Sequence, residues 1–193
     1  FAVLAMSAKE QIPLTIFLMG LYIAFIQRDR VPGLATSGFA LAWFITAFFV
    51  IIPVHNTEGA SPYLARYEHL GSSPRDILST FFDQPDRILP TLLTPQKVEY
   101  LRSLFMPVLF LSAFSPLTAA LALPDLSINL LSTFPAMYTG GSHYSSAIIP
   151  LVVVSGIYGL ANLRLLVSRF GEQATEGVVY GCSILVLVFS VQS

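Results

Sequence analysis

The sequence predicts an all-helical protein whose chain enters or crosses a membrane about five to six times. Apolar residues make up 54% of the 193-residue chain and charged residues only 11%, a balance that suits lipid better than water. The apolar residues also run in stretches of membrane length, since a bilayer core takes about 20 helical residues to cross. The chain begins with Phe1 and enters an apolar stretch directly, so we expect it to be a segment of a longer protein.

Two spans are expected before the first polar segment. The first covers residues 7–26, with Pro13 near its first turn, where proline is tolerated. The second covers residues 33–54, and Arg28 and Arg30 lie in the short turn between the two. Because short cytoplasmic loops are enriched in arginine, this turn is predicted to face the cytoplasm and the chain after the second span to face outward.

Residues 55–103 form one long polar insert, which we expect to fold as a small helical cap outside the membrane. Ser61, Ser73 and Thr94 each precede a proline, and a hydroxyl side chain followed by proline is a typical helix start. Asp76 lies three residues after Ser73, which is the spacing of a capping box. The insert is therefore predicted to be ordered.

The chain after the insert is predicted to enter the membrane and return. Four prolines interrupt residues 104–137. Residues 104–123 have the length of one span, whereas residues 126–134 have only half that length. Irregular backbone survives in a membrane only where protein or a water-filled cavity surrounds it. We therefore expect a hairpin broken near Pro124 and sheltered by protein, with Asp125 in a polar pocket or at a membrane face.

Two further spans are expected at residues 147–163 and 177–191, joined by a turn that carries Arg164 and Arg169 and so favours the cytoplasm. Small residues four positions apart allow helices to approach closely, within the chain or between subunits. Two such pairs occur here: Ser155 with Gly159, and Gly177 with Gly181. The chain thus divides into two transmembrane helices at 1–54, the outer insert at 55–103 and the remaining transmembrane helices at 104–193.

Composition excludes several classes of function. The net charge is −1 and the ten Lys and Arg residues are scattered, whereas nucleic-acid binding requires a basic stripe or patch. Cys182 is the single cysteine, so it forms neither an intrachain disulfide nor a multi-cysteine metal site. The His and acidic residues of the insert match no established spacing of metal ligands, and no phosphate loop or nucleophile elbow occurs. We expect no nucleic acid, no metal and no cofactor.

Six residues are candidates for binding a substrate or a lipid phosphate: Lys9, Glu10, Arg66, Tyr67, His143 and Tyr144. Lys9 and Glu10 form an ionisable pair near the start of a span. Charges at such places often mark a site or a pathway. The same two residues also fit a simpler role at the membrane interface, with Glu10 at a helix N-terminus and Lys9 extending toward water.

The other four candidates lie on the side predicted to face outward. Arg66 offers a guanidinium, whose geometry matches a phosphate, and Tyr67 lies beside it. A structural salt bridge to Glu68 or Asp76 is the alternative for Arg66. His143 and Tyr144 follow two glycines, where they could contact a substrate or serve as the aromatic residues common at membrane interfaces.

Several motifs occur in order along nearly the whole chain. They are Lys9-Glu10 opening a span, Ile51-Ile52-Pro53 closing one, YLARYEHLGSSPRDI at residues 63–77, the proline-rich residues 104–123, Leu123-Pro124 through Asn129-Leu130-Leu131-Ser132, and His143-Tyr144 before Ile148-Ile149-Pro150. In their order and spacing they resemble the family of polytopic membrane proteins catalogued as domain of unknown function 2079, DUF2079.

The resemblance implies a bacterial inner-membrane protein with many spans. Members of that family are similar in layout to the GT-C membrane glycosyltransferases, which transfer sugars from polyprenyl-phosphate carriers on the outer side of the membrane. In such enzymes the catalytic carboxylate usually lies in the first outer loop, near the N-terminus. Glu58 and Glu68 do not match that position. The catalytic part is therefore expected to lie outside this chain.

Three functions follow as hypotheses. The leading one is a segment of a GT-C-like glycosyltransferase that holds a polyprenyl-phosphate sugar among membrane lipids. The second is a non-catalytic accessory or structural subunit that binds other membrane subunits. The third is a transporter built around the broken helices near Pro124, which the lack of an inverted repeat disfavours.

Overall fold

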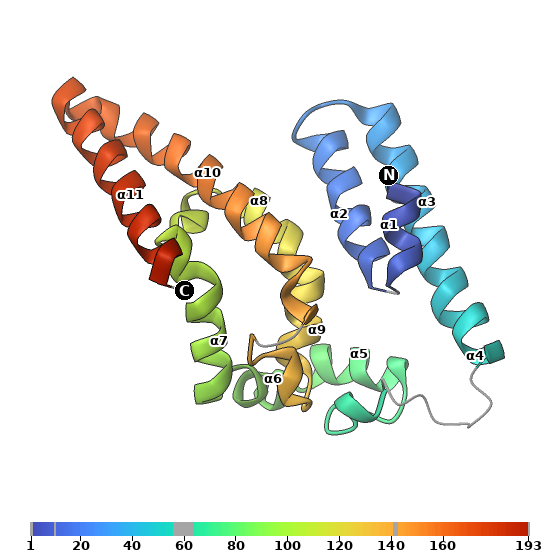
Figure 1. Cartoon of the computed structure of the whole chain (residues 1–193). Helices are drawn as coiled ribbons and strands as arrows, with labels where there is room; N and C mark the ends of the chain where they lie inside the picture. The colour runs from blue at the N-terminus through green and yellow to red at the C-terminus, as the bar shows by residue number, and fades with distance from the viewer. Residues whose placement is uncertain (1, 10, 56–63, 141–142, 193) are drawn as a thin grey trace.

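The computed structural model describes residues 2–9, 11–55, 64–140 and 143–192, and within these ranges every regular element is a helix and none is a strand. Three helices are long and apolar enough to cross a membrane: Arg30–Ile51, Ile148–Phe170 and Glu172–Phe189. Two shorter apolar helices accompany them, at Ile12–Phe25 and Pro116–Leu131. These helices confirm the predicted all-helical membrane fold (Figure 1).

The N-terminal helices are α1 (Ala2–Ala8), α2 (Ile12–Phe25) and α3 (Arg30–Thr46). The span expected at residues 7–26 is therefore divided, because one helix ends at Ala8 and the next begins at Ile12. Pro13 accounts for the division, since proline has no N–H to donate within a helix but fits its first turn.

Helices α2 and α3 lie side by side (Figure 1). A Cβ on Gly20 would meet the Ser37 hydroxyl, and a Cβ on Gly33 would meet the Ala24 backbone. Small residues thus allow the two backbones to approach closely, as is common between membrane helices. The longer helix begins at Arg30, earlier than predicted, and continues through a π turn (Ala47–Ile51) into α4 (Ile52–His55).

The described part of the insert is helical. A 3-10 turn (Leu64–Tyr67) is followed by α5 (Pro74–Asp83), α6 (Pro85–Leu92) and α7 (Pro95–Phe105), and each of these three helices begins with a proline. At the start of α5, the Asp76 backbone N–H donates to Ser73 Oγ (3.2 Å) and Ser73 Oγ donates to the Asp76 carboxylate (2.8 Å). This confirms the predicted capping box.

The other two predicted helix starts have different outcomes. Thr94 precedes α7 as expected, but its side chain forms no capping hydrogen bond and its Oγ1 is buried without a partner. The prediction of a hydroxyl cap at Thr94 is therefore wrong, and Pro95 alone marks the start of that helix. Ser61 lies outside the described residues.

The chain after α7 turns back within a short distance. After a 3-10 turn (Met106–Val108), Leu109 and Phe110 adopt left-handed backbone angles, with φ of 52° and 54°. A second 3-10 turn (Leu111–Phe114) leads to the returning limb: α8 (Pro116–Ala119), a 3-10 turn (Ala120–Ala122) and α9 (Leu123–Leu131). Residues 104–123 are thus not one straight helix, and the reversal lies at residues 109–115 rather than at Pro124.

The C-terminal part consists of α10 (Ile148–Val167), which ends in a 3-10 turn (Ser168–Phe170), and α11 (Glu172–Gln192). The largest buried apolar cluster joins α7, α9 and α10, with Ile148 fully buried at the start of α10. A Cβ on Gly159 would overlap the Leu111 carbonyl. The Ser155–Gly159 pair is therefore used for packing within the chain, whereas Gly177 and Gly181 have nothing within 4 Å of an added Cβ.

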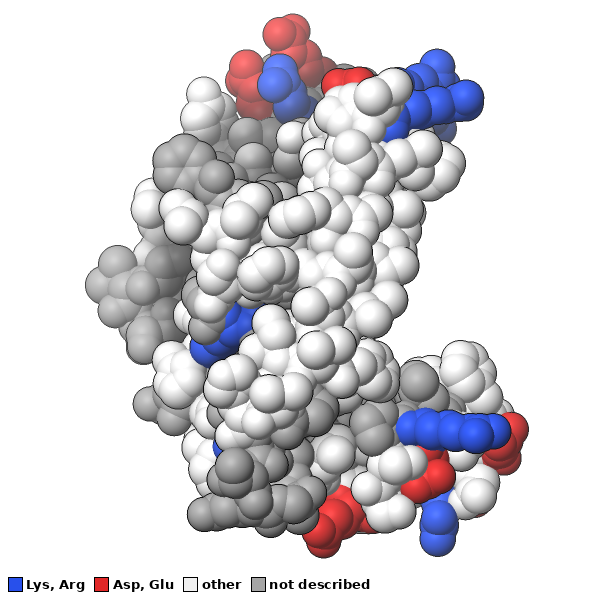
Figure 2. Space-filling model, turned by 90° about the vertical axis from the view of Figure 1, so that its right-hand side faces the viewer, with Lys and Arg blue, Asp and Glu red and all other residues white. Residues whose placement is uncertain are grey.

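The helices place polar segments at two opposite ends. The turn between α2 and α3 and the turn between α10 and α11 lie at one end, and the insert helices α5 and α6 lie at the other (Figure 1). On the face shown in Figure 2, acidic and basic side chains gather mainly at these two ends, with a broad uncharged band between them. This distribution is typical of a protein whose middle is surrounded by hydrocarbon.

Candidate functional site

Five residues from four distant segments meet near the insert, and we call them the cation–aromatic cluster: Lys9, Arg66, Phe134, His143 and Tyr144. Lys9 Nζ lies 5.5 Å from the Tyr144 ring centroid, and Arg66 Cζ lies 5.8 Å from the same centroid. Arg66 Cζ also lies 4.8 Å from the centre of the Phe134 ring. Two positive charges therefore face one aromatic side chain.

The two remaining rings support Tyr144. His143 stacks on it, with 4.6 Å between the ring centroids, and Phe134 meets it edge to face at 6.4 Å. Both His143 and Tyr144 belong to a 3-10 turn (His143–Ser145) that directly precedes α10. His143 is exposed and Tyr144 is half-buried, so the cluster reaches the surface.

Hydrogen bonds with residues that follow α9 fix the position of Arg66. The Thr133 backbone N–H and hydroxyl both donate to the Arg66 carbonyl, at 2.9 and 3.0 Å. Arg66 Nη1 donates to Met137 Sδ at 3.6 Å. Tyr67 donates from its hydroxyl to the Ile128 carbonyl at 3.0 Å. The 3-10 turn of the insert is thereby attached to the end of α9, and the guanidinium is held beside the aromatic rings.

The sequence-predicted candidates are therefore close neighbours. The structure brings Lys9, Arg66, His143 and Tyr144 together, and Tyr67 adjoins them with its hydroxyl directed at α9. Glu10 lies outside the described residues. Sequence reasoning missed Phe134, although an aromatic residue just before Pro135 at a membrane face is a signal that could have indicated it.

The arrangement suits binding of an anion. The N–H groups of a guanidinium match the oxygens of a phosphate or a carboxylate, to which they can donate. The rings also attract the two cations and hold them in place. The cluster can thus present two positive charges to one anionic group beside apolar helices.

A buried polar network lies next to the cluster. Thr15 on α2 donates from its hydroxyl to Asp125 Oδ2 at 2.5 Å. Asn129, one turn further along α9, donates from Nδ2 to the Tyr100 hydroxyl (2.9 Å) and to the Tyr144 carbonyl (3.3 Å). Both Asp125 and Asn129 are 0% exposed. This confirms the prediction of a polar pocket for Asp125, whereas Asn129 was not among the predicted site residues.

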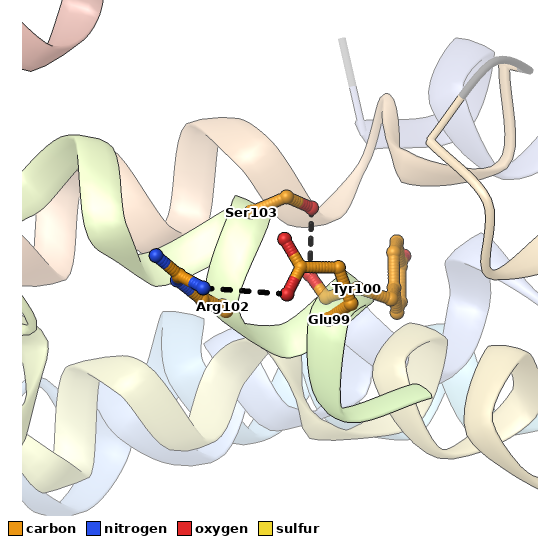
Figure 3. A network of polar contacts seen from close by, with 4 residues as sticks. All are labelled: Glu99, Tyr100, Arg102 and Ser103. Carbon is orange, nitrogen blue, oxygen red and sulfur yellow. Dashed lines mark hydrogen bonds and ion pairs between the residues drawn. The ribbon is translucent and has the colours of Figure 1, made fainter. Parts of the chain in front are cut away.

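Tyr100 connects this network to the insert through α7. Its hydroxyl is 3.0 Å from Ser145 Oγ, and Ser103 Oγ donates to its carbonyl at 2.8 Å. Figure 3 shows the Tyr100 ring apart from the exposed ion pair that Arg102 forms with Glu99 at 3.6 Å. Exposed pairs of this kind contribute little to stability. The buried Tyr100 ring, and not the exposed ion pair, therefore joins α7 to the polar network.

Lys97 is the second cation of the insert that contacts a ring. It is almost fully buried, donates from Nζ to the Thr91 carbonyl at 2.8 Å and lies 5.0 Å from the Tyr138 ring centroid. Burial lowers the pKa of the Lys97 ammonium. Partial burial, and then the charge of Lys97, lower the pKa of His69. In the described part of the chain, no group of three His, Cys, Asp or Glu side chains is placed to hold a metal.

The fold and the site define a helical membrane protein with a cationic, aromatic cluster near one end. The model of the DUF2079 family, described as a predicted membrane protein, matches residues 1–193. The chain therefore belongs to this family. Neither the curated proteins nor the solved structures include a match to this chain.

Proposed function

We propose that this chain is the donor-holding part of a GT-C-like glycosyltransferase of the bacterial inner membrane. In this proposal the protein is multi-pass, the insert faces outward, and the cation–aromatic cluster binds the phosphate of a polyprenyl-phosphate sugar. A carboxylate elsewhere in the whole protein deprotonates the acceptor. The chain itself supplies the charges and the apolar surface that hold the donor.

The observation that carries this proposal is the meeting of Lys9 and Arg66 over Tyr144. Cationic side chains near the surface of a membrane protein are commonly spread apart and extend toward water. Here two of them face one ring, at 5.5 and 5.8 Å. A phosphate between them would receive charge-assisted hydrogen bonds, which are about twice as strong as neutral ones.

The neighbourhood fits a donor whose remaining part is a long hydrocarbon. Exposed apolar side chains of the returning limb, among them Leu117 and Leu123, offer surface for an isoprenoid chain. His143 is exposed beside Tyr144 and can donate to a sugar hydroxyl. The cluster then fixes the phosphate, which is the leaving group in the transfer.

The test measures binding of a polyprenyl phosphate to the complete protein by native mass spectrometry. The matching polyprenol, which lacks the phosphate, is the ligand control. Lys9→Ala and Arg66→Ala should each weaken binding of the phosphate by about ten- to a hundredfold, as expected for loss of a charge-assisted contact. Binding of the polyprenol should be unchanged.

Arg87→Ala is the matched control variant, because Arg87 is an exposed arginine of the same insert, on α6. It should leave binding of the phosphate unchanged. Equal binding by the Lys9 and Arg66 variants and the wild-type protein would refute the proposed site. An equal loss with Arg87→Ala would indicate a general charge effect and would also refute it.

A second function is favoured by a separate observation. An added Cβ on Gly177 or Gly181 would meet no described atom within 4 Å, so this face of α11 is open to another helix. Small residues at this spacing are typical of helix interfaces in membranes. An accessory subunit would use the face to bind a membrane partner. Disulfide trapping at Gly177→Cys, in a Cys182→Ser background, would identify such a contact.

A further inference from the structure

The polar network around α9 contains two buried oxygen atoms with no donor. Asp125 Oδ1 and Asn129 Oδ1 are both buried, and neither accepts a hydrogen bond from any residue that the structure describes. The two residues are four apart on one helix, so their side chains lie on the same face. Buried polar atoms in proteins almost always have partners. Two unpartnered acceptors on one helix face therefore lack the donor or cation that buried oxygens ordinarily have.

The orientation of the Asn129 amide is fixed by its neighbours. Its Nδ2 faces the Tyr144 carbonyl at 3.3 Å and the Tyr100 hydroxyl at 2.9 Å. A flipped amide would direct Oδ1 at the Tyr144 carbonyl, and two acceptors would then face each other. Asn129 Oδ1 is therefore the atom left without a partner.

Asp125 needs a compensating charge. It is 0% exposed and lies in an apolar helix, where an uncompensated carboxylate is costly. Thr15 provides one hydrogen bond to Oδ2. Within the described ranges, neither Lys nor Arg forms an ion pair with Asp125. An ionised Asp125 would therefore need a positive charge that these side chains do not supply.

We propose that Asp125, Asn129 and Thr15 form a site for a small monovalent cation, with Na⁺ as the ligand. All candidate ligand atoms are carboxylate, amide or hydroxyl oxygens, which suit hard cations. The 3-10 turn Ala120–Ala122 directly precedes α9, which carries Asp125 in its first turn, and interrupted membrane helices are where ions are commonly bound. The cation would link Thr15 on α2 to Asp125 on α9. Asn129 would bind it through Oδ1 while its Nδ2 donates to the Tyr144 carbonyl. The proposal does not depend on lipid binding at the cation–aromatic cluster.

The test uses the complete protein in detergent, without any polyprenyl phosphate. Equilibrium binding of radioactive ²²Na⁺ is measured together with the thermal unfolding midpoint in NaCl and in choline chloride of equal ionic strength. The wild-type protein should bind Na⁺ saturably and unfold at a higher temperature in NaCl, because a ligand of the folded state stabilises it. Absence of saturable Na⁺ binding would overturn the proposal.

Three variants locate the site. Asp125→Asn should abolish Na⁺ binding, and Asn129→Leu and Thr15→Val should weaken it by about tenfold or more, as expected for loss of a contact with a charged group. If Asp125→Asn does not fold, the other two variants still decide the question. Unchanged Na⁺ binding in both of them would overturn the site.

Ser112→Ala is the control, because Ser112 belongs to a different buried pair, with Ser155 at 2.8 Å. It should lower the unfolding temperature without changing Na⁺ binding. Stability that depends on pH but not on Na⁺ would overturn the proposal in favour of a proton on Asp125. Such a result would leave the phosphate site untouched, since the two tests use different ligands.

Discussion

The Lys9 ammonium lies 5.5 Å from the ring centroid of Tyr144, although the two residues come from opposite halves of the chain. The contact connects the turn between α1 and α2 to the turn that begins α10. Arg66 reaches the same ring from the insert. One aromatic side chain therefore holds three segments together, and its substitution should affect both stability and the position of the cations.

Replacing Tyr144 by leucine should lower the free energy of unfolding by about 1–2 kcal/mol, because two cation–π contacts are lost. Tyr144→Phe retains the ring and should have a much smaller effect. Thermal unfolding in detergent compares the two variants. A similar loss for both would show that the hydroxyl, and not the ring, is responsible.

The sequence predicts those structural features that depend only on residues close together in the chain. The helical starts at Ser73 and at the prolines of α5 and α7 are local, because capping and proline geometry involve only neighbouring residues. The expected reversal within residues 104–137 follows from its prolines together with the arginine content of the neighbouring loops. Its position does not, since Leu109 and Phe110 are residues that rarely adopt φ above 0°.

The sequence predicted which residues of the candidate site lie near the same membrane face, but not which of them are in contact. Charge asymmetry between loops placed Lys9, Arg66 and Tyr144 near one membrane face before their contacts were known. Which rings meet the cations depends on packing between distant segments, so the position of Phe134 before Pro135 indicates an interface aromatic residue but not its contact with Arg66. Asn129 was missed because one amide in an apolar run gives no signal until its partner Tyr100 is known.

Ser73→Ala should cost about 1 kcal/mol of local helix stability at the start of α5, because the hydroxyl accepts from the Asp76 backbone N–H at 3.2 Å. Local unfolding measured by hydrogen exchange of the α5 amides checks this. Ser79→Ala is a suitable control, since that exposed hydroxyl donates to the Asp76 carbonyl instead of capping the helix. A larger effect at Ser79 would contradict the role of the cap.

The hydrogen bonds between Ser73 and Asp76 also predict that stability depends on pH. Hydrogen bonds from Ser73 and then Ser72 lower the pKa of Asp76 below its ordinary value. The folded state therefore holds this proton less tightly than the unfolded chain. Its contribution to stability is present above the unfolded pKa and is lost as the pH falls through the lower, folded pKa. In Ser73→Ala the pKa of Asp76, followed by carboxyl NMR, should move upward toward its ordinary value.

Gly159→Ala should destabilise the protein by about 1–3 kcal/mol, the usual cost of overpacking, because the new Cβ would overlap the Leu111 carbonyl. Gly177→Ala is the matched control on α11. Its Cβ would meet nothing within 4 Å, and alanine favours a helix over glycine. Thermal unfolding should therefore show a loss for the first variant and none for the second.

The orientation in the membrane gives the last prediction. Arg28 lies in the turn between α2 and α3, and Arg30 is the first residue of α3. Arg164 and Arg169 lie near the turn between α10 and α11, and the two turns are at the same end of the molecule (Figure 1). Arginine in short loops favours the cytoplasm. In a Cys182→Ser background, Ser146→Cys should therefore react with an impermeant maleimide in intact cells, and Ser168→Cys should react only after permeabilisation. Both serines are exposed, so labelling reports the side of the membrane. The opposite pattern would invert the protein and place the cation–aromatic cluster in the cytoplasm, where an outward-facing donor could not reach it.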